Sequence, residues 1–145
     1  MPGLSINNTQ IANEFFEDAR LIGIQSPMEP HRFVWMVNRQ FGYRFQYQNG
    51  GEIRMQAQKR MYEFPVYQCP EPNMELLHML FINSDDGKHL LPELKHIDFL
   101  WLLKGNISSD DFLESLMAEL RKLEQVQLVI ELTNEKIKHK ENLVV

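Results

Sequence analysis

The sequence predicts an α+β domain in which a mostly antiparallel sheet of about five to seven strands packs against two main helices. Two observations support this expectation. Several strand-like segments follow one another directly, and only two segments place apolar residues at helical spacing. The 145 residues suit one domain, 1–145, whose first twelve residues are polar and expected to be frayed.

The first strand and the first helix are bounded by prolines. Residues 19–24 are apolar except for Arg20, and the Ser26-Pro27 pair ends the predicted strand because a residue before proline avoids helical geometry. Pro30 suits a first helical position, and Gly42 can close the helix in a left-handed conformation. Between them, apolar residues recur at helical spacing: Phe33, Val34, Val37 and Phe41.

A hairpin is predicted next. Residues 43–48 and 53–58 each alternate apolar and polar side chains, and Asn49-Gly50-Gly51 between them accepts the positive φ of a turn. Residues 62–67 could add a third strand, which Pro65 would place at an edge or a bulge because proline cannot donate to a ladder.

The second half predicts two central strands, a helix and a last strand. Residues 76–82 and 97–103 are almost wholly apolar, and a turn at 84–87 separates them from the motif described below. Ser108 or Ser109 would begin the helix, followed by two acids that complement its dipole. Its apolar stripe is Phe112, Leu113, Leu116, Met117, Leu120 and Leu123. Period-two alternation over 126–132 predicts the final strand, whereas 133–145 is ambiguous.

The charge is unevenly distributed. The net charge of −5 argues against bulk electrostatic binding to nucleic acid, but residues 31–62 hold six basic residues and one acid. Four of these cations form a possible partner surface: Arg44, Arg54, Lys59 and Arg60. With the nearby rings of Tyr43, Phe45 and Tyr47, the 32–60 region could also bind RNA weakly, unless these rings face the core.

The sequence contains no recognisable catalytic or cofactor motif. The single cysteine, Cys69, excludes an intrachain disulfide and fits a reducing compartment. The five histidines lack metal-ligand spacing and are expected at the surface or at strand ends, so no metal and no cofactor is expected. The start of the chain does not resemble a signal peptide, and no apolar run could span a membrane. We therefore expect a cytoplasmic protein that is not an enzyme.

The most distinctive segment is Leu91-Pro92-Glu93-Leu94-Lys95-His96-Ile97-Asp98-Phe99. Pro92 would stiffen a turn that enters the second central strand, and Asp98 would point away from the face of Ile97 and Phe99. One hypothesis is structural: Glu93 or Asp98 caps a neighbouring backbone segment or accepts a salt bridge. The other is a small ligand site built around Glu93, His96 and Asp98.

This segment resembles the motif of the bacterial IPExxxVDY family. Proline, glutamate and aspartate match in register, and the three apolar positions carry conservative replacements. The tail Lys138-His139-Lys140-Glu141-Asn142-Leu143 is similar to the end of that family, with histidine where serine is expected, and residues 21–27 are compatible. The resemblance implies no activity, substrate or cofactor. Phe99 stands at the family's tyrosine, so a phenolic hydroxyl cannot be essential here.

These observations leave three hypotheses for function. The first is a small non-enzymatic binding or adaptor domain that acts through contact with another protein or a second copy of itself. The second is a small-ligand binder or enzyme that uses the Glu93, His96 and Asp98 region. The third is weak RNA binding through residues 32–60.

Overall fold

The computed structural model describes residues 14–72, 74–105 and 110–143. Its two α-helices are α2 (Pro30–Phe41) and α3 (Asp110–Arg121). The strands are β1 (Ala19–Gln25), β2 (Gln46–Tyr47), β3 (Ile53–Ala57), β4 (Arg60–Phe64), β5 (Val66–Pro70), β6 (Leu76–Ile82), β7 (Ser84–Asp85), β8 (Lys88–His89), β9 (Phe99–Gly105) and β10 (Leu128–Glu131). Short 3₁₀ turns are η1 (Pro92–Leu94), η2 (Asn134–Lys136) and η3 (Lys140–Leu143).

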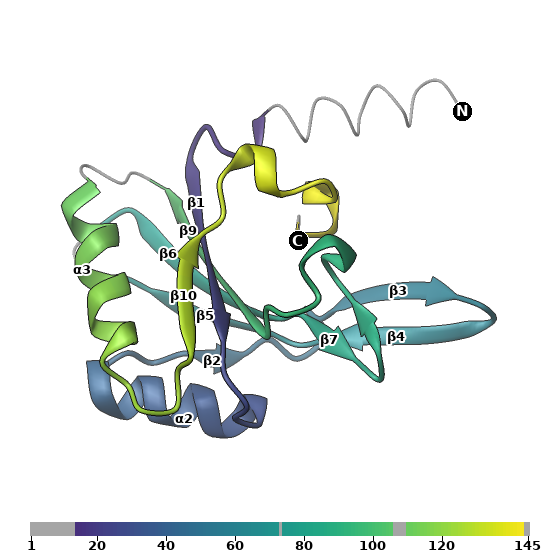
Figure 1. Cartoon of the computed structure of the whole chain (residues 1–145), viewed down its shortest axis with the longest axis horizontal. Helices are drawn as coiled ribbons and strands as arrows, with labels where there is room; N and C mark the ends of the chain where they lie inside the picture. Colours follow the sequence, from purple (N-terminus) through teal and green to yellow (C-terminus); the bar gives the residue numbers. More distant parts are fainter. Residues whose placement is uncertain (1–13, 73, 106–109, 144–145) are drawn as a thin grey trace.

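The main sheet has six strands in the order β10-β1-β9-β6-β5-β2, and every neighbouring pair is antiparallel. Together with the two helices, this sheet confirms the predicted α+β class (Figure 1). The first strand of the chain lies inside the sheet, between β9 and β10. The sheet is therefore completed by strands that are distant in sequence.

The prediction for α2 is confirmed at both ends. The helix starts at Pro30, and Gly42 follows it in the left-handed conformation with φ 72°. The Gly42 N–H donates to the carbonyl of Asn38, which ends the helix as predicted. In α3 the buried residues all belong to the predicted stripe: Leu113, Leu116, Met117 and Leu120. The serines predicted to begin that helix, and the frayed start of the chain, lie outside the described residues.

The predicted hairpin around Asn49-Gly50-Gly51 is wrong. Strand β2 pairs with β5, whereas β3 pairs with β4 to form an arm that projects from the sheet (Figure 1). The arm turns at Gln58 and Lys59, whose φ values of 53° and 65° fit a two-residue turn of the mirror-image type. Such turns strongly prefer Asn-Gly, so Gln-Lys gives no turn signal in the sequence. Pro65 then divides the predicted third strand between β4 and β5.

The central strands and the turn between them agree with prediction. Strand β6 has the predicted bounds, and β9 begins at Phe99, two residues later than expected. The 84–87 turn joins β7 to β8, with positive φ at Asp86 and Gly87. These two strands pair only with each other in the described residues. The motif segment therefore leads from this small hairpin into the centre of the main sheet.

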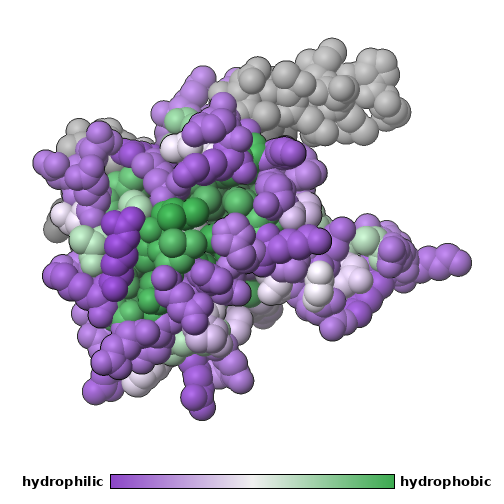
Figure 2. Space-filling view, viewed as in Figure 1, coloured by the Kyte–Doolittle hydropathy of each residue, from purple (hydrophilic) through white to green (hydrophobic). Residues whose placement is uncertain are grey.

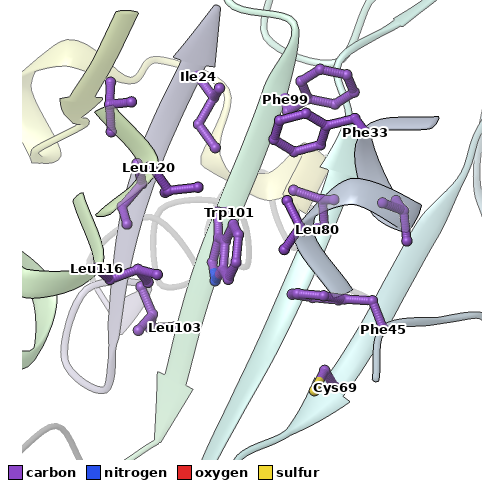
Figure 3. Packing of buried hydrophobic residues seen from close by; sticks show 14 of the residues in the cluster. Ile24, Phe33, Phe45, Cys69, Leu80, Phe99, Trp101, Leu103, Leu116 and Leu120 are labelled. Atoms are coloured by element: carbon purple, nitrogen blue, oxygen red, sulfur yellow. The ribbon is translucent and has the colours of Figure 1, made fainter. Parts of the chain in front are cut away.

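A hydrophobic core lies on each face of the sheet. The helical core, between the sheet and α2 and α3, has Trp101 at its centre, as Figure 3 shows. The Phe33 and Phe99 rings stack there with centroids 4.1 Å apart. The tail core, on the other face, packs the motif segment and the tail against the sheet: Leu21, Phe64, Met79, Phe81, Leu90, Leu91, Ile97, Leu102, Leu132, Ile137 and Leu143.

Both edges of the main sheet are modified in ways that hinder strand addition. At the β10 edge, the Val129 carbonyl accepts a bond from Arg121 Nη2 at 2.8 Å, and the Glu131 carbonyl accepts one from Lys136 Nζ at 3.3 Å. At the other edge, β2 is only two residues long. Short strands and cations are common means of protecting an edge. Figure 2 nevertheless shows apolar residues gathered over the β10 region, where Leu128 and Ile130 are half-buried.

Candidate functional site

A buried asparagine that sequence analysis missed organises the motif loop, which we define as residues 90–98. Asn83 directly follows β6 and is fully buried. Its side-chain Nδ2 donates to the carbonyls of Leu94 at 3.1 Å and Ile97 at 2.7 Å, and its Oδ1 accepts the N–H of Leu91 at 3.0 Å. One amide group therefore satisfies backbone groups from both ends of the loop. The signal in the sequence was a polar residue at the end of an almost wholly apolar strand.

Asp98 fastens the motif loop to the end of β1. Its Oδ2 accepts the backbone N–H of Ser26 at 2.8 Å, and its own N–H donates to the carbonyl of Ile24 at 2.9 Å. Ser26 is 2% exposed, and its hydroxyl donates to the carbonyl of Gln125. Asp98 thus makes the kind of contact that the structural hypothesis described, a carboxylate that caps a neighbouring backbone segment.

Glu93 fastens the other side of the loop to the tail. Its Oε2 accepts the backbone N–H groups of Lys138 at 2.7 Å and His139 at 3.0 Å, and its Oε1 lies 2.8 Å from His139 Nδ1. Burial raises the pKa of the Glu93 carboxyl, but these bonds favour the charged form and together hold the pKa below its ordinary value. An ionised Glu93 can only accept, so His139 Nδ1 donates the proton of that bond.

One further tail residue, Asn142, contacts the same loop: its Nδ2 donates to the carbonyl of Leu90 at 2.7 Å. The buried Lys140 instead donates from Nζ to the carbonyl of Ile137, just before the tail. Lys138 is exposed, and Glu141 is half-buried. The three segments that carry the family resemblance, 21–27, 91–99 and 138–143, are therefore joined by hydrogen bonds.

The motif residues are not brought together on one concave surface. Glu93 is directed to the tail and Asp98 to the end of β1, while Pro92 and His96 are exposed. His96 makes no hydrogen bond or ion pair within the part of the chain that the structure describes. The cavity described below is lined by other residues. In this arrangement the carboxylates hold backbone segments and are not free to bind a substrate.

Two of the four cations in the predicted basic surface are paired with acids. On the β3–β4 arm, Arg54 lies 3.1 Å from Glu52 and 3.4 Å from Glu63, and Arg60 pairs with Asp86. The other two cations are exposed: Lys59 lies in the turn of the arm, and Arg44 lies in the segment before β2.

The rings expected near these cations differ in exposure. Phe45 is buried and Tyr43 half-buried, whereas Tyr47 is 45% exposed. Most of the rings invoked for RNA stacking are therefore occupied by packing.

A second buried polar network crosses the helical core. Trp101 Nε1 donates to His78 Nδ1 at 2.9 Å, and His78 Nε2 lies 2.6 Å from Glu71 Oε2. Because indole is only a donor, Nδ1 must accept, so the neutral ring carries its proton on Nε2 and donates it to Glu71. Burial lowers the pKa of His78, and Glu71 opposes this shift only in part. The expectation that the histidines lie at the surface or at strand ends is wrong for His78, which is fully buried within β6.

Cys69 is also buried, and the backbone N–H of Arg44 donates to its Sγ. Within the described ranges, no three histidine, cysteine, aspartate or glutamate side chains gather closely enough to hold a metal ion. Nor does any described helix have the length and apolarity needed to cross a membrane.

Comparison with known proteins adds no relative. No family model matches the chain, and neither a curated protein nor a solved structure is significantly similar to it. The function must therefore be argued from the residues themselves.

The Glu93 contacts lead to a test of the tail attachment. We expect Glu93→Gln to lower the free energy of unfolding by about 1–3 kcal/mol at pH 7, because a neutral amide replaces a carboxylate that accepts three bonds. Since the folded pKa of Glu93 lies below its ordinary value of 4.5, its contribution is complete above pH 4.5 and is lost as the pH falls through the folded pKa.

Urea unfolding of both proteins from pH 7 down to pH 3 measures this difference. The exposed Glu124→Gln is the matched control and should change little at any pH. A Glu93→Gln difference that stays constant below pH 4.5 would contradict the assigned role of the ionised carboxylate.

Proposed function

We propose that this chain is a non-enzymatic binding domain that docks an acidic segment of a protein partner on the outer face of α2. The observation that carries this proposal is Trp35. It is 62% exposed, and the Arg39 guanidinium lies over its ring, 5.3 Å from the centroid. Exposure of a large aromatic ring to water is unfavourable. A partner that covers this ring would gain the free energy of burying its apolar surface.

The geometry of α2 places Trp35 at the middle of its outer face. The four buried residues of the helix define the opposite face: Phe33, Val34, Met36 and Val37. At 100° per residue, Trp35 and Arg39 point directly away from that face, with His31 and Arg32 to either side. Tryptophan and arginine are the residue types most enriched among the residues that dominate binding energy at interfaces.

The positive charge of this face favours an acidic partner. The helix contains Arg32 and Arg39 and no acid, although the whole chain carries a net charge of −5. The nearest acid in sequence, Glu29, lies 3.5 Å from His31. An acidic segment with one or two apolar residues would complement both the cations and the indole.

Two other observations favour protein contact over the alternatives. The Glu93 and Asp98 carboxylates are engaged by backbone N–H groups, which leaves the motif loop without free reactive acids. The arginines of the β3–β4 arm are paired with acids, which weakens the case for RNA binding there. The exposed Trp35 has no comparable role within the fold.

Selection of peptides by display against the purified full chain tests the proposal. We expect the selected peptides to be acidic with apolar anchors, and we expect Trp35→Ala to weaken their binding about 30-fold, as for a residue that dominates an interface. Arg39→Glu should weaken binding by at least a similar factor because it reverses the charge. Met61→Ala is the matched control, since Met61 is also exposed (52%) but lies on the β3–β4 arm.

The proposal fails if no peptide is enriched, or if enriched peptides bind Trp35→Ala and the unaltered protein equally. A second outcome is that a single-stranded RNA oligonucleotide binds at physiological salt and loses binding in Trp35→Ala. That result would show that the partner of this face is a nucleic acid and not an acidic protein. Circular dichroism melts establish that the variants remain folded.

We further propose that the protein is cytoplasmic and belongs to the IPExxxVDY family. The hydrogen bonds that join segments 21–27 and 138–143 to segment 91–99 support the family assignment, because the residues that carry the resemblance form one structural unit. The single buried cysteine supports a reducing compartment. Mass spectrometry of fractionated source cells tests the location, and recovery in a membrane or secreted fraction would contradict it.

A further inference from the structure

A cavity of about 580 Å³ opens on the tail side of the sheet, on the face opposite the helices. Its floor consists of side chains at alternating positions of neighbouring strands. Met79 of β6 pairs with Leu102 of β9, and one step along the sheet Leu77 pairs with Lys104. Leu143 of the tail and Phe15 contribute to the walls. This volume is in the range of small-molecule sites.

The floor is apolar and well protected. Ala19, Met79 and Leu102 are each at most 5% exposed, and Leu143 is 1% exposed. A ligand that enters this cavity would therefore meet aliphatic and thioether groups on several sides. Such a surface favours an apolar body over a sugar or a nucleotide.

The polar groups of the cavity are few, and three of them are unengaged. The side chains of Asp18, Gln68 and Lys104 make no hydrogen bond or ion pair within the described residues. Asp18 and Lys104 are exposed and Gln68 is half-buried, so a ligand entering from solvent can reach them, unlike the buried and bonded Asn83 and His78. The unengaged groups are available to orient a ligand.

The two charged side chains among them, Asp18 just before β1 and Lys104 in the neighbouring strand β9, are not paired with each other. Ala19 pairs with Lys104 across β1 and β9, and the Asp18 carbonyl accepts the N–H of Gly105 at 2.7 Å. Asp18 and Lys104 therefore lie within one residue step of each other across the strand pair, and neither makes an ion pair with any described residue. A ligand with charges of both signs would satisfy both groups.

We propose that this cavity binds a small apolar zwitterion, of the class of apolar amino acids and short apolar peptides, with its carboxylate at Lys104 and its ammonium group at Asp18. The apolar side chains of the ligand lie on Leu102 and Met79. A fatty acid would leave Asp18 unpaired beside its carboxylate, and an apolar amine would meet the Lys104 cation. This site is independent of the proposed protein-docking face, because it lies on the other side of the sheet.

Calorimetry on the full chain with the dipeptide leucyl-leucine tests this inference. We expect binding in the micromolar to millimolar range, with Lys104→Met and Asp18→Asn each weakening it about tenfold. Acetyl-leucyl-leucine amide, which lacks both charges, should bind weakly and equally to all variants. Lys95→Met is the matched control, since Lys95 is exposed and lies outside the cavity.

Methyl NMR of the methionines locates the ligand. The Met79 methyl signal should shift on addition of leucyl-leucine, and the Met61 signal on the distant arm should not. The inference is overturned if leucyl-leucine at about 10 mM produces neither heat nor a Met79 shift. It is also overturned if Lys104→Met binds as tightly as the unaltered chain, or if octanoate or octylamine binds more tightly than the dipeptide.

Discussion

Replacing Asn83 by alanine is expected to lower the free energy of unfolding by about 3–5 kcal/mol, a large share of the 5–15 kcal/mol typical of a domain. The substitution removes three hydrogen bonds at a position with no access to water. It leaves the Leu91 N–H and the Ile97 carbonyl without their partners, whereas the Leu94 carbonyl keeps the bond from the Ile97 N–H. Each buried group that loses its partner costs about 1–3 kcal/mol.

Asn83→Asp separates the donor role from the acceptor role. A carboxylate could still accept the Leu91 N–H, but it would face the carbonyls of Leu94 and Ile97 with no proton to donate. We expect a loss at least as large as that of Asn83→Ala, because a buried charge is added.

Urea unfolding followed by tryptophan fluorescence measures both variants. Asn134→Ala, at an exposed position in η2, is the control and should cost less than about 0.5 kcal/mol. If Asn83→Ala costs no more than this control, the amide does not hold the motif loop.

Replacing Gly105 by alanine is expected to cost about 4 kcal/mol or more, or to prevent folding. The glycine ends β9 with φ 127°, a conformation that side chains rarely adopt. A Cβ atom there would lie 2.1 Å from the carbonyl oxygen of Glu75 and 3.1 Å from its carbon. Because these are backbone atoms of the neighbouring segment, no side-chain rotation relieves the overlap.

Gly87→Ala provides a matched control for the conformational part of this cost. Gly87 also has positive φ, at 86°, but nothing lies within 4 Å of its added Cβ. We therefore expect a loss of about 1–3 kcal/mol from backbone strain alone. Thermal and urea unfolding measure the loss of stability in each variant. The difference between the two losses gives the cost of the overlap with Glu75. Equal losses would show that the close approach at Gly105 relaxes without cost.

The elements could be predicted from sequence wherever one local signal determined them. Helix α2 has a proline at its start and a glycine after its end, and the stripe of α3 repeats at helical spacing, so both were predicted correctly. The β3–β4 turn could not be recognised, because Gln58 and Lys59 adopt positive φ without the residues that favour it. The Asn49-Gly50-Gly51 signal, by contrast, occurs between strands that do not pair with each other.

The site could be predicted only in part. The proline-centred motif could be singled out from the sequence, and a structural role was one of two hypotheses for it. The partners of Glu93 and Asp98, however, lie 45 and 72 residues away in sequence. Such partners depend on strand order, which single-sequence patterns do not specify. The exposure of Trp35 could not be predicted from the sequence. Which side of a helix faces solvent depends on the elements that pack against its other sides.

The position of β1 has a consequence for how the protein forms during translation. This strand emerges from the ribosome before its two neighbours, which are β9 at residues 99–105 and β10 at residues 128–131. Its apolar residues therefore remain unpaired until β9 and β10 have been synthesised. Long-range pairing of this kind slows folding and leaves the nascent chain dependent on protection from aggregation. Completion of the sheet and attachment of residues 138–142 to the motif loop would then be among the last steps of folding.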